Sequence, residues 1–125
     1  MSRFHSLLKV DLIGDTLVVS PCASGIGFRY KDLQTELNRI MRMIDLPDPD
    51  EVVTNLVVDL GELTYYGNEF LQSIISMMNR IGQRGGRAVW CNGSAEMLAF
   101  LAERGVGELW PYFPSRDEAM SAVVA

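Results

Sequence analysis

The chain has 125 residues and a mass of 13.9 kDa, a size that predicts one domain spanning residues 1–125. With 48% hydrophobic and 22% charged residues, it should be soluble and globular, which excludes a disordered chain. The net charge of −5 disfavours nucleic-acid phosphates and anionic lipid headgroups, so we expect nucleic acid not to be a partner.

The few cysteines and the single histidine limit the chemistry. Cys22, Cys91 and His5 match no metal-ligand spacing, and two cysteines are too few for a secreted disulfide scaffold. A Cys22–His5 nucleophile and base would lack an orienting carboxylate. No P-loop or dinucleotide fingerprint is present. We therefore expect no enzyme and no cofactor. Without a signal peptide or an apolar run of about 18 residues, we also expect a cytoplasmic protein that does not insert into membranes.

The first half of the chain predicts a hairpin followed by a helix. Strands over residues 4–13 and 16–20 flank Gly14-Asp15, a pair suited to a tight turn. Residues 22–27 are small and form a loop, after which apolar residues recur at helical spacing to about residue 44. Pro47 and Pro49 end this helix.

The middle of the chain carries the strongest signals. Residues 56–60 are a short run of β-formers, which predicts a central strand covered on both faces. Residues 70–81 then form one apolar stripe of helical period, with Asn68 as the expected N-cap, and Gly85-Gly86 ends the helix.

The last third predicts two more strands, each followed by a helix. The first strand covers residues 87–91, and its helix starts from Asn92 or Ser94 and ends near residue 105. The second covers residues 109–113 and should lie at the sheet edge because of Pro111. Ser115 and Glu118 have the spacing of a capping box that opens the final helix.

This alternation predicts an α/β fold: a mixed sheet, with an N-terminal hairpin plus parallel strands, and about four helices. The loops after parallel strands gather at one rim of such a sheet, here residues 61–68, 91–94 and 22–28. Asp59 and Glu62 lie there, and we interpret them as a solvated acid and a turn residue. Because neighbours in an extended segment point opposite ways, one of Tyr65 and Tyr66 should be exposed, which suits protein recognition.

About half of the chain resembles the STAS domain, the family of anti-sigma factor antagonists, stressosome subunits and sulphate-transporter tails. The segment NLVVDLGELTYYGNEFL, residues 55–71, is similar to the family's central strand, loop and helix start. The segment RIGQRGGRAVWCNGSAEMLAFLAERGVGELWPYFPSRDEAM, residues 80–120, continues with the family's Gly-Gly, strand, helix, aromatic strand and final helix. The resemblance implies the STAS fold.

In antagonists of this family, a serine of the loop is phosphorylated by the partner kinase. Aligning Leu71 with the family's leucine places Asn68 at that serine, and an amide cannot take a phosphoryl group. The resemblance therefore implies a non-catalytic interaction module without the usual switch. Its expected partner-binding residues are Thr64, Tyr66, Gly67, Asn68, Glu69 and Phe70.

Several partners remain open under this interpretation. The first is an anti-sigma factor or a related kinase, and a homo-oligomer is also possible. The alternative is a transporter ATPase, with the chain as a cytoplasmic accessory subunit of a lipid ABC-type transport system. A small ligand or nucleotide on the rim is a third hypothesis. Phosphorylation of this loop would contradict an interaction module without a switch, and Thr64 and Ser73 are the nearby hydroxyls to check.

Overall fold

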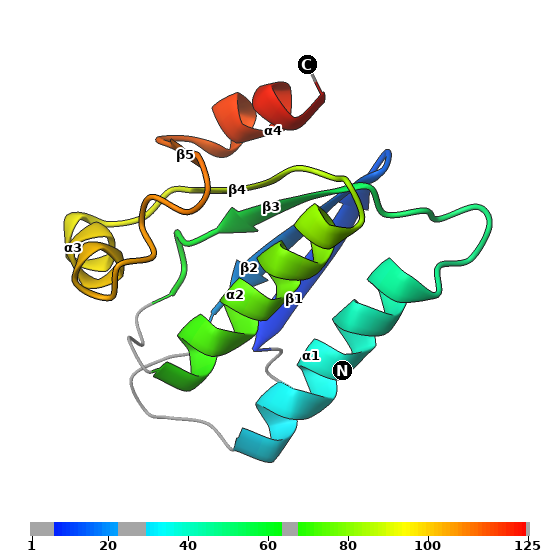
Figure 1. Ribbon diagram of the computed structural model, residues 1–125, viewed down its shortest axis with the longest axis horizontal. Coiled ribbons are helices and arrows are strands. Elements are labelled where there is room, and N and C mark those ends of the chain that lie inside the picture. The colour runs from blue at the N-terminus through cyan, green and yellow to red at the C-terminus, as the bar shows by residue number, and fades with distance from the viewer. Residues whose placement is uncertain (1–6, 23–29, 64–67, 125) are drawn as a thin grey trace, which may run out of the picture.

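The computed structural model describes residues 7–22, 30–63 and 68–124. Its five strands form one sheet in the order β1-β2-β3-β4-β5 (Figure 1). The strands are β1 (Leu8–Ile13), β2 (Thr16–Pro21), β3 (Asn55–Asp59), β4 (Ala88–Cys91) and β5 (Tyr112–Phe113). β1 and β2 are antiparallel, and β2, β3, β4 and β5 are parallel in turn. The predicted mixed sheet is confirmed.

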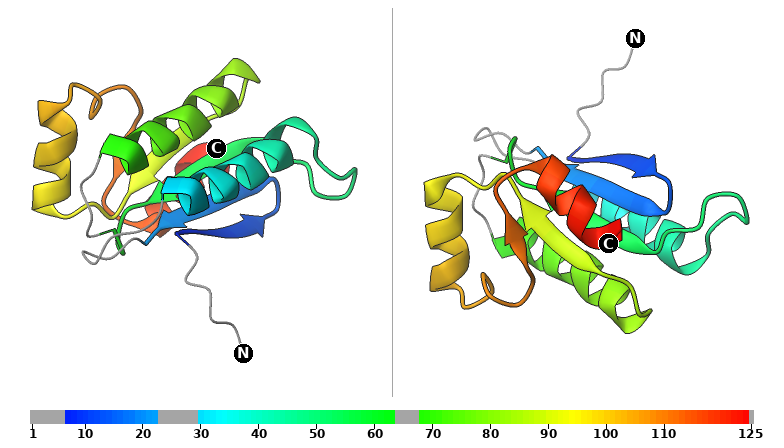
Figure 2. Two further views of the ribbon diagram at one scale, coloured as in Figure 1. Left: turned by 90° about the horizontal axis from the view of Figure 1, so that it is seen from below. Right: turned by 90° about the horizontal axis from the view of Figure 1, so that it is seen from above.

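Four helices are present in the described part of the chain: α1 (Tyr30–Asp45), α2 (Asn68–Gln83), α3 (Ala95–Glu103) and α4 (Arg116–Val124). α1 and α2 cover one face of the sheet and α4 covers the other, while α3 lies to one side of these layers (Figures 1 and 2). Right-handed crossovers are expected between parallel neighbouring strands, and they place α1 and α2 on the same face of the sheet, the face with the larger core cluster.

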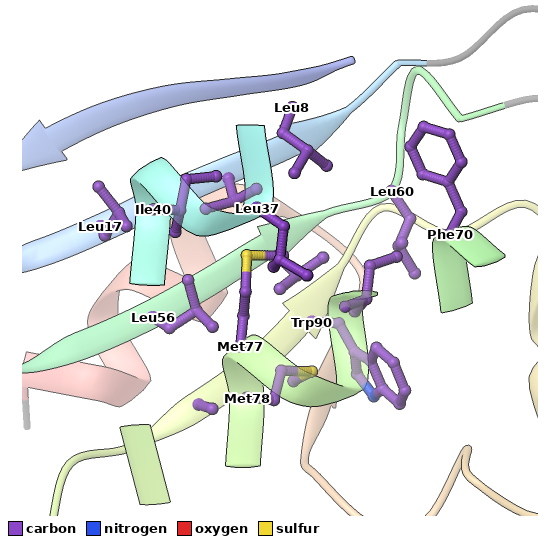
Figure 3. Close-up of a cluster of buried hydrophobic side chains, with 14 of the residues drawn as sticks. Leu8, Leu17, Leu37, Ile40, Leu56, Leu60, Phe70, Met77, Met78 and Trp90 are labelled. Atoms are coloured by element: carbon purple, nitrogen blue, oxygen red, sulfur yellow. The ribbon is translucent and has the colours of Figure 1, made fainter. Parts of the chain in front are cut away.

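The core is built by strict alternation along the central strands. In β3, Leu56 and Val58 belong to the cluster under α1 and α2, whereas Val57 packs with Val123 of α4. All of these side chains are at most 4% exposed. Figure 3 shows the larger cluster, in which Met77 and other α2 side chains point toward the sheet. The predicted burial of this strand on both faces is confirmed.

The ends of β2, β3 and β4 differ from the prediction by one residue, and three other differences affect the interpretation. The last strand covers only residues 112–113 rather than 109–113, and Leu109 is 59% exposed. Within the described residues, the first strand begins at Leu8, and residues 4–6 lie outside them. α2 begins at Asn68 itself, so Asn68 is the first helical residue rather than the residue before the helix.

Other predicted features are confirmed by hydrogen bonds. The Ser94 side chain accepts from Met97 N at 3.0 Å and caps α3. Ser115 Oγ accepts from Glu118 N at 3.2 Å, as the capping-box spacing predicts. β5 is the edge strand that Pro111 requires, and the Pro111 carbonyl accepts from Trp90 N at 3.1 Å.

Candidate partner-binding site

The structure describes part of the predicted partner-binding segment. Thr64, Tyr66 and Gly67 lie outside the described residues, as does the side chain of Glu69. Asn68 is exposed at the start of α2. Phe70 is only 1% exposed and lies in the core beside Leu60 (Figure 3). The prediction that Phe70 contacts a partner is therefore corrected: its side chain belongs to the core at the start of α2.

The described side chains on the outward side of α2 carry no charge. Among the α2 side chains that the structure describes, the exposed ones are polar and neutral, and Gly82 lies among them. We call this surface the α2 face, and it consists of Asn68, Gln72, Ser76, Asn79 and Gln83. Arg80 is half-buried and lies 3.7 Å from Asp45 of α1, so its charge is turned away toward the neighbouring helix.

α1 provides a contrast on the same side of the sheet. Its exposed positions include Lys31, Asp32, Arg39 and Arg42, which keep a charged surface in water. Charged groups are depleted in the centres of protein interfaces because their desolvation is costly, whereas amides can exchange hydrogen bonds with water for bonds with a partner. The α2 face is thus the better suited of the two helix surfaces for contact with another protein.

A buried carboxylate organises the rim beside this helix. Asp59, the last residue of β3, has only 6% of its surface exposed. Its oxygens accept from Arg116 Nε at 2.9 Å, from Asn92 Nδ2 at 3.2 Å and from Gly61 N at 2.9 Å. Arg116 also donates to Ser20 Oγ at 3.3 Å. We call Asp59, Gly61, Asn92, Arg116 and Ser20 the Asp59 cluster.

The Asp59 cluster corrects the prediction of a solvated acid. Its hydrogen bonds connect β2, β3, the residues after β4 and the start of α4, all at one end of the sheet. It holds the loop after β3 at Gly61, and the buried Leu63 N donates to Leu60 O at 3.2 Å. The described start of the loop that leads to α2 is therefore fixed. Glu62 remains a turn residue, exposed and paired with Lys9 at 3.0 Å.

Sequence reasoning missed two members of this cluster. Arg116 is 57 residues from Asp59, and periodicity gives no signal for such a pair. Asn92 has a positive φ of 61°, a conformation that asparagine adopts more readily than most residues. An asparagine directly after a buried strand was the one available hint, because the loops after parallel strands meet at the same rim.

The thiols are poorly suited to nucleophilic chemistry. Burial raises the pKa of Cys91 to about 12, with a further contribution from the Asp59 charge, so this thiol stays protonated at neutral pH. Burial also raises the pKa of Cys22, and His5 lies outside the described residues. Within residues 7–22, 30–63 and 68–124, no group of histidine, cysteine or acidic side chains could hold a metal ion.

The alternative hydroxyls are also constrained. Ser73 is 2% exposed, so a kinase cannot reach it in the folded chain, and Thr64 lies outside the described residues. Of the two hydroxyls to check, Ser73 is therefore not accessible to a kinase in the folded chain. No helix in the described part of the chain is both long enough and apolar enough to cross a bilayer.

Comparison with known proteins rests on structure. No protein-family profile and no curated protein sequence matches the chain. A STAS domain protein from Planctomyces limnophilus superposes with a TM-score of 0.74 at 18% identity, over 94% of this chain and 98% of that one. The chain has the STAS fold. The unphosphorylated anti-sigma factor antagonist SpoIIAA gives a TM-score of 0.74 at 14% identity, over 94% and 96% of the two chains.

A third likeness is to a much longer protein. SLC26A9 superposes with a TM-score of 0.60 at 14% identity, over 90% of this chain but only 20% of its own. All three identities are low, so these likenesses carry the fold and not the partner. The STAS fold that the resemblance implied is confirmed, and the roles of the predicted contact residues other than Phe70 stay predictions.

Proposed function

We propose that the chain is a non-catalytic protein-interaction module that binds a regulatory partner through the start and the outward side of α2. The contact surface comprises Thr64, Tyr66, Gly67, Asn68 and Glu69, extended by the rest of the α2 face. Phe70 acts as a core support for this surface. The neutral, hydrogen-bonding character of the α2 face is the observation that carries the proposal.

The residue at position 68 determines whether phosphorylation there can switch the contact. Asn68 is exposed and carries an amide where the resemblance places the phosphorylated serine. The amide donates and accepts hydrogen bonds but takes no phosphate, so the partner meets a neutral side chain at position 68 at all times. Binding is then controlled by the amount of each protein or by the partner's own state.

The likeness to SpoIIAA, an anti-sigma factor antagonist that shares the fold over almost its whole length, supports an anti-sigma factor or a related kinase as the first candidate partner. The likeness to part of SLC26A9 supports a second candidate, in which the chain is a cytoplasmic accessory subunit of a membrane transporter. Its partner would be a transporter ATPase. Both candidates use the same module, and they differ in the protein that is bound.

Site-specific photo-crosslinking in native cells tests the proposal. A photoreactive residue at Gln72 should capture one defined partner, whereas the same residue at Asn38, exposed on α1, should not. Mass spectrometry of the product distinguishes an anti-sigma factor or kinase from a transporter ATPase. Equal capture at both positions would contradict the α2 face as the contact surface.

Affinity measurements with the purified partner then locate the interface. Gln72→Glu and Asn68→Asp each place a carboxylate in a neutral contact and should weaken binding at least about tenfold, since an unpaired charge is costly to desolvate. Asn68→Asp is favourable at a helix N-terminus, so folding stability should not fall. Asn38→Asp is the matched control and should leave the affinity unchanged. Unchanged affinity in all three variants would refute the interface.

A further inference from the structure

β1 has an outer edge that no strand of the described chain covers, because β2 is its sole neighbour in the sheet (Figure 2). Cys22 N donates to Leu7 O at 3.0 Å, and these residues are directly opposite in the register of the hairpin. Hydrogen-bonded pairs alternate along an antiparallel ladder. Leu8, Val10 and Leu12 therefore direct their backbone N–H and C=O groups outward, away from β2.

The side chains along this edge alternate in character. Lys9 and Asp11 are exposed on the face of the sheet opposite α1. Val10 and Leu12 point to the other face, where they are half-buried against the core. An exposed edge strand is a template for pairing with another chain, and its side chains decide which partner fits.

We propose that β1 pairs antiparallel with β1 of a second copy of this chain, with the two-fold axis at Val10. In this register Lys9 of each copy lies opposite Asp11 of the other, so both cross-strand pairs join opposite charges. A register centred on Lys9 or on Asp11 would instead place two like charges directly opposite each other. Of these three registers, the charge pattern favours the one centred on Val10.

Four backbone hydrogen bonds fit the same register. The two Val10 residues exchange N–H···O=C bonds in both directions, and the N–H of Leu12 in each copy reaches the C=O of Leu8 in the other. Leu8 N already donates to Glu36 Oε1 at 2.9 Å and needs no further partner. Pairing also covers the remaining exposed surface of Val10 and Leu12, so the contact joins hydrogen bonds to apolar burial.

One competing contact involves Lys9. Its Nζ lies 3.0 Å from Glu62 Oε1, but the two side chains are 56% and 57% exposed. Such a pair is screened by water and contributes little, so it does not prevent Lys9 from turning to Asp11 of the other copy. The opposing hypothesis is that Lys9 and Asp11 only shield the edge of a monomer.

Sedimentation equilibrium between about 1 and 500 µM tests the pairing, because an interface made by one strand is small and should dissociate at about 10–100 µM. Lys9→Glu and Asp11→Lys, each alone, place like charges opposite and should weaken the dimer at least about tenfold. An equimolar mixture of these two variants restores opposite charges at both pairs and should dimerise as the wild type does. Lys31→Glu on α1 is the matched charge control.

A backbone variant tests the edge itself. Val10→Pro removes an N–H that faces outward, so it should leave the hairpin intact by circular dichroism and abolish the dimer. A wild-type chain that stays monomeric at about 500 µM would overturn the proposal. So would a mixture of Lys9→Glu and Asp11→Lys that stays monomeric, and that result does not depend on how the proline variant folds.

Discussion

The ion pair between Asp59 and Arg116 should measurably stabilise the fold, unlike an ordinary surface pair. At 2.9 Å and an effective dielectric of about 20, the attraction is about 6 kcal/mol before the cost of desolvation. Asp59 keeps 9% of its side chain exposed and bears most of that cost, while Arg116 keeps 41% and remains hydrated. A double-mutant cycle with Asp59→Asn and Arg116→Met should therefore give a coupling free energy of about 1.5–3 kcal/mol.

Urea unfolding of the four proteins in the cycle measures this coupling. Asp59→Asn keeps an oxygen that can accept from Gly61 N. The stability lost in this variant therefore reports mainly the removed charge and not a broken hydrogen bond in the turn. The exposed Lys9–Glu62 pair is the matched control and should give at most about 1 kcal/mol. A coupling between Asp59 and Arg116 no larger than that control would refute the assignment of this pair as the anchor of the rim.

Four further variants test the packing and the buried thiol. Gly86→Ala would place a Cβ in a clash with the backbone oxygen of Thr54 and should lower the free energy of unfolding in urea by more than about 3 kcal/mol. Gly82→Ala meets open space, so it should be neutral or raise the free energy of unfolding by up to about 1 kcal/mol. Phe70→Ala empties a buried position and should lower the unfolding free energy by about 3–5 kcal/mol. Burial raises the pKa of Cys91 in the folded chain from 9.0 to about 12. The stability that the protonated thiol contributes is therefore complete below pH 9 and falls by about 1.4 kcal/mol per pH unit between pH 9 and about 12. Cys91→Ala should remove this slope from the dependence of the unfolding free energy on pH.

The sequence predicted the elements whose signal lies in local periodicity. The apolar run of β3 and the stripe of α2 are buried as expected, because burial on two faces and burial on one face leave different spacings. The last strand was predicted too long because Trp110 packs against the core instead of pairing in the sheet. Trp110 packs edge-on against Trp90, with ring centroids 5.6 Å apart at 86°, and so lies against the core outside the ladder.

The Asp59 cluster was beyond local reasoning for a related physical reason. A carboxylate at the end of a buried strand has the same sequence signature whether it faces water or an arginine 57 residues later. Only the crossover from β4 through β5 to α4 brings Arg116 to it. The same limit applied to Phe70, whose place in the α2 stripe indicated burial while the resemblance placed it at the contact surface.

The α2 face and the outer edge of β1 lie on different parts of the molecule, and pairing through β1 would strengthen partner binding at α2. β1 is at one edge of the sheet, and α1 lies between it and α2, which packs over β3 and β4. In an antiparallel pair, directly opposite residues project to the same face of the sheet. The two-fold axis is therefore perpendicular to the sheet, and both copies carry α2 on the same side. A β1-linked dimer would therefore present two α2 faces together, and a partner with two matching sites would bind by avidity. Val10→Pro should then lower the apparent affinity for a dimeric partner but not for a monomeric one, which surface plasmon resonance with each partner form would measure.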